Sequence, residues 1–243
     1  MNTVLVTGAG TGIGRAVAEK FLAEGFQVVA VGRRPEPLRE LERTNPLKIR
    51  AIPCDISKPD DVKKLVSYLK SDATFGATLS VLVNNAGTYE RKSFADSNDV
   101  DWTSTFEVNL FGAVRLTREA MPLLEKNQGA IVNVSSTLGL RPVSQTSVYS
   151  ASKAAMINWT KALAIESGAR KVRVNCVCPG IIDTPIHPFH AKPEAQTALQ
   201  NLQPLGRIGK PEDVAHAVWS LAGPGSEWIT GAVLSVDGGI ELV

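Results

Sequence analysis

The stretch "TGAGTGIGRAVAEKF", residues 7–21, decides the fold. It follows an apolar run, "TVLVT" at 3–7, that predicts a buried strand, and it opens an amphipathic segment typical of a helix. Gly8, Gly12 and Gly14 are spaced for a tight turn at which backbone N–H groups can face a pyrophosphate. Plain structural turns also use glycine, but the position between a strand and a helix favours a dinucleotide site.

The rest of the chain alternates short β-branched runs with longer amphipathic segments, a pattern typical of a parallel sheet with helices on both faces. Strands are predicted at 3–7, 27–32, 49–54, 79–84, 130–135, 172–177 and 232–237. Helices are predicted at 13–24, 37–43, 59–71, 100–125, 147–167 and 211–221. No linker or repeat interrupts this order, so we expect one α/β domain over residues 1–243, a doubly wound Rossmann fold with a seven-stranded parallel sheet. The proline-containing stretch 181–210 is the least regular, and we expect it to form a variable loop with a short helix over the substrate.

Composition narrows the class of protein. Apolar residues make up 44% of the chain, charged residues 21%, and the formal net charge is +2, which favours neither nucleic acid nor a membrane surface. No segment has the pattern of a signal peptide or the length of a membrane span. Cys54, Cys176 and Cys178 lie in apolar runs, so we expect buried reduced thiols and a cytoplasmic location.

The end of the second predicted strand bears on the choice of nucleotide. In "VVAVGRRPEP", residues 28–37, Gly32 stands where an acid usually binds the ribose of NAD, and Arg33 and Arg34 follow it. Two guanidinium groups suit the additional phosphate of NADP, so NADP(H) is the expected cofactor and NAD(H) the alternative. Two solvated arginines on a loop would give the same pattern. Asp55, after the third strand, is a candidate contact of the adenine amino group.

A second motif, "VYSASKAA" at 148–155, places Tyr149 and Lys153 four positions apart, on one face of a helix. The pair serves either packing or chemistry. A tyrosine phenol titrates near pH ~10, so it needs a neighbouring positive charge to act as a base at neutral pH, and Lys153 supplies one. The small residues around the pair leave room for a cofactor and a substrate.

Taken together, the motifs resemble those of the short-chain dehydrogenase/reductase family over essentially the whole chain. The resemblance rests on "TGAGTGIG" at 7–14, "NNAG" at 84–87, the asparagine of "EVNLFGAV" at 107–114, "IVNVSS" at 131–136, "YSASK" at 149–153 and "CPGIIDT" at 178–184. Reductases of 3-oxoacyl carrier proteins are among the relatives that look most similar. The resemblance implies a catalytic tetrad of Asn109, Ser136, Tyr149 and Lys153.

By the same resemblance, each member of the tetrad has an expected role. Tyr149 donates a proton to the developing alkoxide, Ser136 hydrogen-bonds the carbonyl oxygen, Lys153 also binds the nicotinamide ribose, and Asn109 holds a water that connects the lysine to solvent. Ser136 is preferred to Ser135 because it lies at the family's usual distance from the tyrosine.

The resemblance also implies the remaining contacts. Cofactor contacts are expected from Thr11, Ile13, Ile56, Asn85, Ala86, Gly87, Pro179, Gly180, Ile182 and Thr184, besides the glycine turn, the two arginines, Asp55, Tyr149 and Lys153. Substrate contacts are expected from Leu138, Gln145 and Thr146, with Ser136 and Tyr149. Tyr89, Glu90 and Arg91 follow "NNAG" at the same end of the sheet and either contact substrate or are ordinary loop residues.

The sequence therefore predicts an enzyme that interconverts a ketone and a secondary alcohol, acting on a small molecule and forming a homotetramer. The alternatives are a dinucleotide-binding sensor or scaffold without turnover, and a methyltransferase-type nucleotide fold, which has no use for "YSASK". His187 and His190 lie three positions apart, but a metal needs more ligands than this pair, so no metal is expected. The four tryptophans are expected in the core or at a subunit interface.

Overall fold

The computed structural model describes residues 2–186 and 193–243. Seven parallel strands form one sheet in the order β3-β2-β1-β4-β5-β6-β7. The strands are β1 (Thr3–Thr7), β2 (Gln27–Gly32), β3 (Ile49–Pro53), β4 (Leu79–Asn84), β5 (Ala130–Val134), β6 (Arg173–Pro179) and β7 (Val233–Val236). Strands β1 and β4 are neighbours although they are far apart in sequence, so the order of the sheet reverses between them. This is the predicted doubly wound fold.

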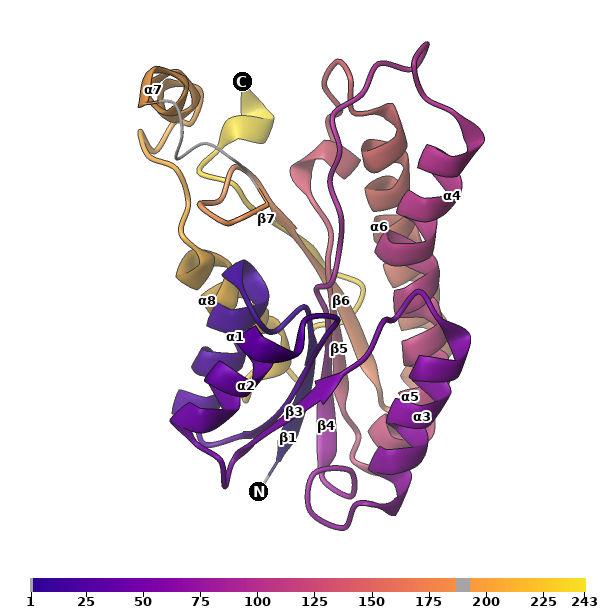
Figure 1. Cartoon of the computed structure of the whole chain (residues 1–243). Coiled ribbons are helices and arrows are strands. Elements are labelled where there is room, and N and C mark those ends of the chain that lie inside the picture. The colour runs from indigo at the N-terminus through magenta and orange to yellow at the C-terminus, as the bar shows by residue number, and fades with distance from the viewer. Residues whose placement is uncertain (1, 187–192) are drawn as a thin grey trace.

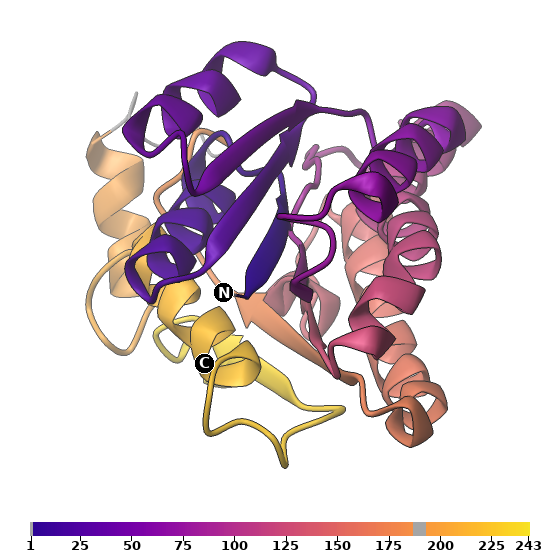
Figure 2. The same cartoon turned by 90° about the horizontal axis from the view of Figure 1, so that it is seen from below.

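Helices cover both faces of the sheet (Figure 1). One layer contains α1 (Gly12–Ala23), α2 (Pro35–Thr44) and α8 (Pro211–Ala222), and the other contains α3 (Pro59–Ser71), α4 (Asp99–Phe106), α5 (Gly112–Lys126) and α6 (Ser147–Ser167). Figure 2, seen from below, separates the two layers by the sheet. Parallel strands covered on both faces are buried along their length, which explains their continuous apolar sequences.

The core lies between the sheet and each helical layer. Strands β1, β4 and β5 are buried throughout. In the layer of α1 and α8, Phe21, Phe26 and Trp219 meet edge to face with ring centroids 5.1–5.6 Å apart. Trp219 therefore belongs to the core, as expected, whereas the side chain of Trp228 is fully exposed on this chain.

One predicted helix differs from the structure. The segment predicted as a single helix at 100–125 consists of α4, a π-helical turn at Glu107–Phe111, and α5. The turn inserts an additional residue without breaking the helix, so the periodicity of apolar residues in the sequence does not reveal it. Its only fully buried member is Asn109, a predicted member of the tetrad.

The stretch predicted as a substrate loop contains a helix of its own. Helix α7 (Pro193–Asn201) lies at the same end of the molecule as the C-terminus (Figure 1). His187 and His190 lie outside the described residues. Leu199 of α7 and Leu202, which follows the helix, line the cleft described next.

Candidate active site

A cleft of about 1000 Å³ opens at the carboxyl ends of the strands. The ends of β1 to β6 all contribute residues to its walls, and it lies where the order of the sheet reverses between β1 and β4. Ligands of open α/β sheets bind at this position, because the loops from the two halves of the sheet separate there. The cleft is large enough for a dinucleotide together with a small substrate.

The glycine turn forms one wall of the cleft. Gly8 and Gly12 have φ angles of +69° and +55°, a region that side chains disfavour. A Cβ at Gly14 would stand 2.3 Å from the carbonyl oxygen of Gly8, and a Cβ at Gly12 would stand 3.2 Å from Cγ2 of Thr184. The turn therefore needs glycine for its own folding and for the narrow passage facing Thr184. It fits a pyrophosphate that approaches the backbone closely.

Thr7 connects the glycine turn to the opposite wall. Its hydroxyl accepts hydrogen bonds from the backbone N–H groups of Asn85 and Ala86, at 2.9 and 3.0 Å. The side-chain amide of Asn85 donates in return to the Thr7 carbonyl at 2.8 Å. These bonds join the ends of β1 and β4 and fix the segment that borders the cofactor. Thr7 was not among the predicted site residues, although the sequence places it at the end of a strand, directly before the glycine turn.

The adenosine end of the cleft carries charge. Arg33 and Arg34 line it, and Arg34 donates a hydrogen bond to the Thr11 hydroxyl at 3.4 Å. Burial acts to raise the pKa of Asp55, but hydrogen bonds from Ser57 and the charge of Arg33 outweigh burial and hold that pKa below its ordinary value. Asp55 is therefore an anion at neutral pH at the edge of the site expected for the adenine.

Helix α6 presents Tyr149 and Lys153 to the cleft from the other half of the sheet. Ser136 lines the same cleft and, as a hydrogen-bond partner of the phenol, acts to lower the pKa of Tyr149. The Lys153 ammonium donates to the carbonyl of Val134 at 2.9 Å and lies 5.8 Å from the centre of the Tyr149 ring. Ser135 points away, with its hydroxyl donating to the Lys153 carbonyl at 2.8 Å. The structure thus brings Ser136, Tyr149 and Lys153 together.

Burial controls the protonation of this pair. It raises the pKa of Tyr149 to about 12, although the hydrogen bond with Ser136 acts in the opposite direction. It lowers the pKa of Lys153 to about 8. The sequence analysis expected the lysine to favour the phenolate; in the structure burial outweighs that effect, because the surroundings disfavour either charged form. Tyr149 is therefore a protonated phenol at neutral pH, and Lys153 exchanges its proton close to neutral pH.

Asn109 is fully buried on the π-helical turn. Its amide group donates to the Thr88 carbonyl at 3.0 Å and to the Ser152 hydroxyl at 3.1 Å, and its oxygen accepts from the Thr88 N–H at 2.8 Å. A Cβ at Gly87 would lie 3.3 Å from this oxygen and 3.6 Å from Nζ of Lys153. Asn109 therefore fixes the segment after β4 against α6, close to the ammonium group.

The opposite side of Tyr149 has mostly apolar walls. The Tyr89 ring meets the Tyr149 ring edge to face, with centroids 4.9 Å apart. Leu138, Val143 and Ile240 also line this part of the cleft. Ile240 comes from the end of the chain, where Asp237 accepts hydrogen bonds from two backbone N–H groups and holds the last turn in place. No sequence pattern connected Ile240 with the site.

Two predicted substrate residues lie elsewhere. Gln145 is exposed with a φ of +67°, and its carbonyl accepts a hydrogen bond from the Lys92 N–H at 2.9 Å. Thr146 is buried, and its hydroxyl bonds with the Val143 carbonyl at 2.6 Å and the Ser150 hydroxyl at 2.8 Å. Neither residue is among the described residues that line the cleft. They shape the loop before α6 and line the small hollow beside Tyr149, and their contact with substrate stays a prediction.

The remaining predicted cofactor and substrate residues lie around one cleft. Apart from Gly14, which supports the turn from behind, every predicted cofactor residue lines the cleft, as does Leu138: Gly8, Thr11, Gly12, Ile13, Arg33, Arg34, Asp55, Ile56, Asn85, Ala86, Gly87, Tyr149, Lys153, Pro179, Gly180, Ile182 and Thr184. Within residues 2–186 and 193–243, no group of three or more His, Cys, Asp or Glu side chains is arranged to hold a metal ion.

Known proteins share this arrangement. Residues 8–241 match the sequence profile of the family described as Enoyl-(Acyl carrier protein) reductase. The chain is 37% identical over 242 residues to the 3-oxoacyl-(acyl-carrier-protein) reductase FabG of Thermotoga maritima, covering 98% of this chain and 97% of the relative. The chain belongs to the short-chain dehydrogenase/reductase family. As a short-chain dehydrogenase/reductase, it is an oxidoreductase that binds a nicotinamide dinucleotide.

Solved structures of other short-chain dehydrogenases/reductases have the same fold. A short-chain dehydrogenase/reductase of Brucella melitensis, titled glucose/ribitol dehydrogenase, superposes with a TM-score of 0.91 at 36% identity and covers 98% of this chain and 96% of its own. The 3-ketoacyl-(acyl-carrier-protein) reductase of the same organism, complexed with NADH, has a TM-score of 0.90 at 32% identity, covering 99% and 98%. Proteins this similar carry names with different substrates, so the substrate side must be judged from its own residues.

Among the helices that the structure of this dehydrogenase/reductase describes, none combines the length and apolar composition that crossing a membrane requires.

Proposed function

We propose that this enzyme interconverts a ketone and a secondary alcohol with Tyr149 as the acid and base, and that it prefers NADP(H) to NAD(H). The observation that carries the proposal is the meeting of Ser136, Tyr149 and the buried ammonium of Lys153 at the wall of a dinucleotide-sized cleft. An acid, an oxyanion donor and a cation meeting at one point are the groups that carbonyl reduction needs.

The chain's own residues account for cofactor binding. The turn around Gly12 would hold the pyrophosphate, Asp55 the adenine, and Lys153 the nicotinamide ribose. Arg33 and Arg34 would bind the 2′-phosphate of NADP, because guanidinium groups pair with phosphate in two-point hydrogen bonds. When bound, the reduced nicotinamide supplies the hydride for the carbonyl carbon.

The proton steps follow from the protonation of the pair. Ser136 donates a hydrogen bond to the carbonyl oxygen, which strengthens as negative charge develops there. Tyr149, with a pKa of about 12, keeps its proton until that oxygen becomes an alkoxide and then donates it. Lys153 stabilises the resulting phenolate. With a pKa of about 8, it also passes a proton inward to restore the phenol, along the side held by Asn109.

The assembly and location are part of the proposal. We expect a homotetramer formed through the helices that carry Asn109 and Tyr149 and through β7. The test is the mass of the assembly in solution, and the mass of a single chain would contradict the proposal. Exposed apolar side chains on these elements, Phe111 and Leu234, support it. The buried free thiols of Cys54, Cys176 and Cys178 support a reducing compartment such as the cytoplasm.

The experiment that tests the function measures nucleotide oxidation by the purified enzyme with NADPH and NADH in parallel. The ketones are methyl 5-oxohexanoate, a 3-oxoacyl thioester and a ketose, and nucleotide binding is followed separately by fluorescence. Turnover of any of them with a preference for NADPH supports the proposal. Tight nucleotide binding without turnover of any ketone would favour the sensor or scaffold instead.

A further inference from the structure

The segment after β4 has two faces. Tyr89 and Arg91 line the large cleft. Glu90 and Lys92 line a small hollow on the other side, next to Asp101 of α4. Within residues 89–92, successive side chains therefore alternate between the two hollows, and every second one faces the cleft.

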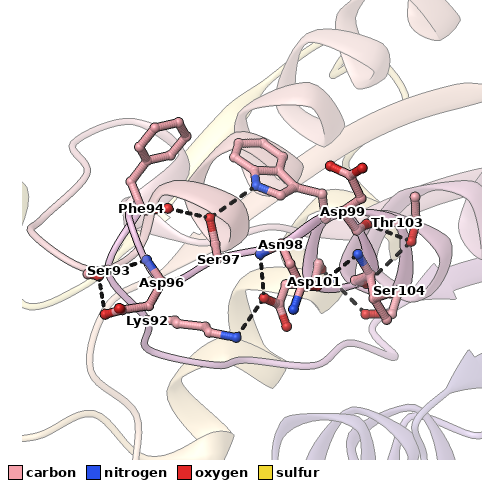
Figure 3. Close-up of polar contacts among 12 residues, drawn as sticks. Lys92, Ser93, Phe94, Asp96, Ser97, Asn98, Asp99, Asp101, Thr103 and Ser104 are labelled. Carbon is pink, nitrogen blue, oxygen red and sulfur yellow. Dashed lines mark hydrogen bonds and ion pairs between the residues drawn. The ribbon is translucent and has the colours of Figure 1, made fainter.

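This segment is fixed on both sides of Arg91. Before it, Tyr89 packs edge to face on the catalytic Tyr149. After it, the Lys92 ammonium forms an ion pair with Asp101 at 2.7 Å. Asp101 also accepts a hydrogen bond at 2.8 Å from the N–H of Asn98, which caps α4, so the lysine is tied to the start of a helix (Figure 3). Arg91 is therefore held at the cleft by structure on either side.

Arg91 is the cation of the cleft that the proposed reaction does not use. The described lining residues include four cations, Arg33, Arg34, Arg91 and Lys153, and one acid, Asp55. The first two lie at the adenosine end, and Lys153 serves catalysis. Arg91 comes two residues after Tyr89, whose ring packs on Tyr149, so the chain brings Arg91 to the Tyr149 end of the cleft.

Among the described residues, the guanidinium group of Arg91 has no ion-pair or hydrogen-bond partner. Its side chain is exposed. The cleft that Arg91 lines also has apolar wall residues, among them Leu138, Val143 and Ile240. A guanidinium beside apolar walls is suited to an amphiphilic ligand, because its planar group of donors pairs with the two oxygens of a carboxylate or phosphate.

We propose that Arg91 binds an oxyanion carried by the substrate, so that the enzyme reduces ketones whose apolar body ends in a carboxylate or phosphate. This inference rests on the proposed function for the reacting ketone, but the binding of the anion does not depend on turnover. Arg91 thereby determines specificity, while Ser136 and Tyr149 hold the carbonyl oxygen.

The first test measures binding to the enzyme saturated with NADPH, from the fluorescence of the nucleotide. The ligands are hexanoate, hexyl phosphate and the uncharged hexanamide. A hydrogen bond to a charged group contributes about 1.5–3 kcal/mol, so the preferred anion should bind about 10- to 150-fold more tightly than the amide. Arg91→Met should abolish this preference and Arg91→Lys should keep part of it. Arg43→Met, which removes an exposed arginine of α2 outside the cleft, is the matched control.

The second test compares turnover of 5-oxohexanoate and its methyl ester. Arg91→Met should lower kcat/KM for the acid about 10- to 150-fold and leave the ester nearly unchanged. Equal binding of hexanamide and both anions to the wild-type enzyme, or equal loss of acid and ester turnover in Arg91→Met, would overturn the inference. The preferred anion in the first test identifies a carboxylate or phosphate substrate. Retained turnover in Tyr149→Phe would refute the catalytic proposal and leave the binding result standing.

Discussion

Replacing Gly32 with aspartate tests how the cleft selects its nucleotide. Gly32 ends β2, and its φ lies outside the left-handed region. A Cβ there would meet only Leu38, at 3.6 Å or more, which is ordinary van der Waals contact. The substitution therefore places a carboxylate beside Arg33 and Arg34 without moving the backbone, and the protein should fold normally.

The size of the change in nucleotide preference follows from the contacts of the new carboxylate. A carboxylate at position 32 should accept hydrogen bonds from the ribose hydroxyls of NADH, repel the 2′-phosphate of NADPH, and pair with the two guanidinium groups that we propose for this phosphate. A charged hydrogen bond contributes about 1.5–3 kcal/mol, which is about 10- to 150-fold in affinity. We expect the ratio of kcat/KM for NADPH to that for NADH to fall by about this factor in Gly32→Asp.

The assay is steady-state kinetics with both nucleotides and one ketone, together with thermal unfolding to show that the variant is folded. Gly168→Asp is the control, since it makes the same chemical change where a Cβ meets nothing within 4 Å and the residue does not line the cleft. An unchanged nucleotide ratio in a folded Gly32→Asp enzyme would refute the assignment of Arg33 and Arg34 to the phosphate.

The remaining predictions concern the turn and the tetrad. Gly14→Ala should abolish NADPH binding and lower the melting temperature, because its Cβ would stand 2.3 Å from the Gly8 carbonyl oxygen; normal fluorescence titration of NADPH would contradict this. Asn109→Ala should lower both kcat and the free energy of unfolding, the latter by about 2–4 kcal/mol in urea titrations, because it leaves the backbone of Thr88 without partners. Because the pKa of Lys153 is about 8, kcat/KM for ketone reduction should fall about tenfold per pH unit above 8 in a pH–rate profile. Between pH 8 and the ordinary lysine pKa of 10.5 the unfolded chain binds more protons at this residue, so urea titrations should show its contribution to the free energy of unfolding rising with pH, and Lys153→Met should lack that rise.

The fold could be predicted because the strands of the sheet and the helices that cover it have different patterns of apolar residues. Buried parallel strands are apolar without alternation, as β4 and β5 are, and the helices between them have an apolar stripe. The seven strands lie within a few residues of their predicted positions. Strand ends depend on local hydrogen bonds, so β6 continues to Pro179 beyond its predicted end at residue 177.

Most of the cofactor half was visible because its residues belong to contiguous motifs. The π-helical turn around Asn109 could not be predicted from the sequence. One additional residue in a helical turn changes the backbone hydrogen bonds, but it leaves no distinct pattern of residue types. The raised pKa of Tyr149 was not predicted either, since burial depends on packing from several elements.

The substrate half could not be assembled from sequence. Tyr89 and Ile240 come from segments without periodicity, 151 positions apart in the chain, and only the fold brings them to one cleft. Gln145 and Thr146 are close to Tyr149 in sequence, but a left-handed residue and two buried hydroxyl bonds keep them out of the large cleft and in the small hollow beside Tyr149. Proximity in sequence is a weak guide where a loop precedes a helix.

The most direct test of the proposed chemistry follows deuterium from NADPH labelled at the transferring position of its nicotinamide into the product alcohol. The wild-type enzyme should place deuterium on the carbinol carbon of a ketone that it reduces. Tyr149→Phe should bind NADPH as the wild type does and form the deuterated alcohol about 10²- to 10⁴-fold more slowly, the usual contribution of a positioned acid. Formation of the deuterated alcohol by Tyr149→Phe at the wild-type rate would contradict the role of Tyr149.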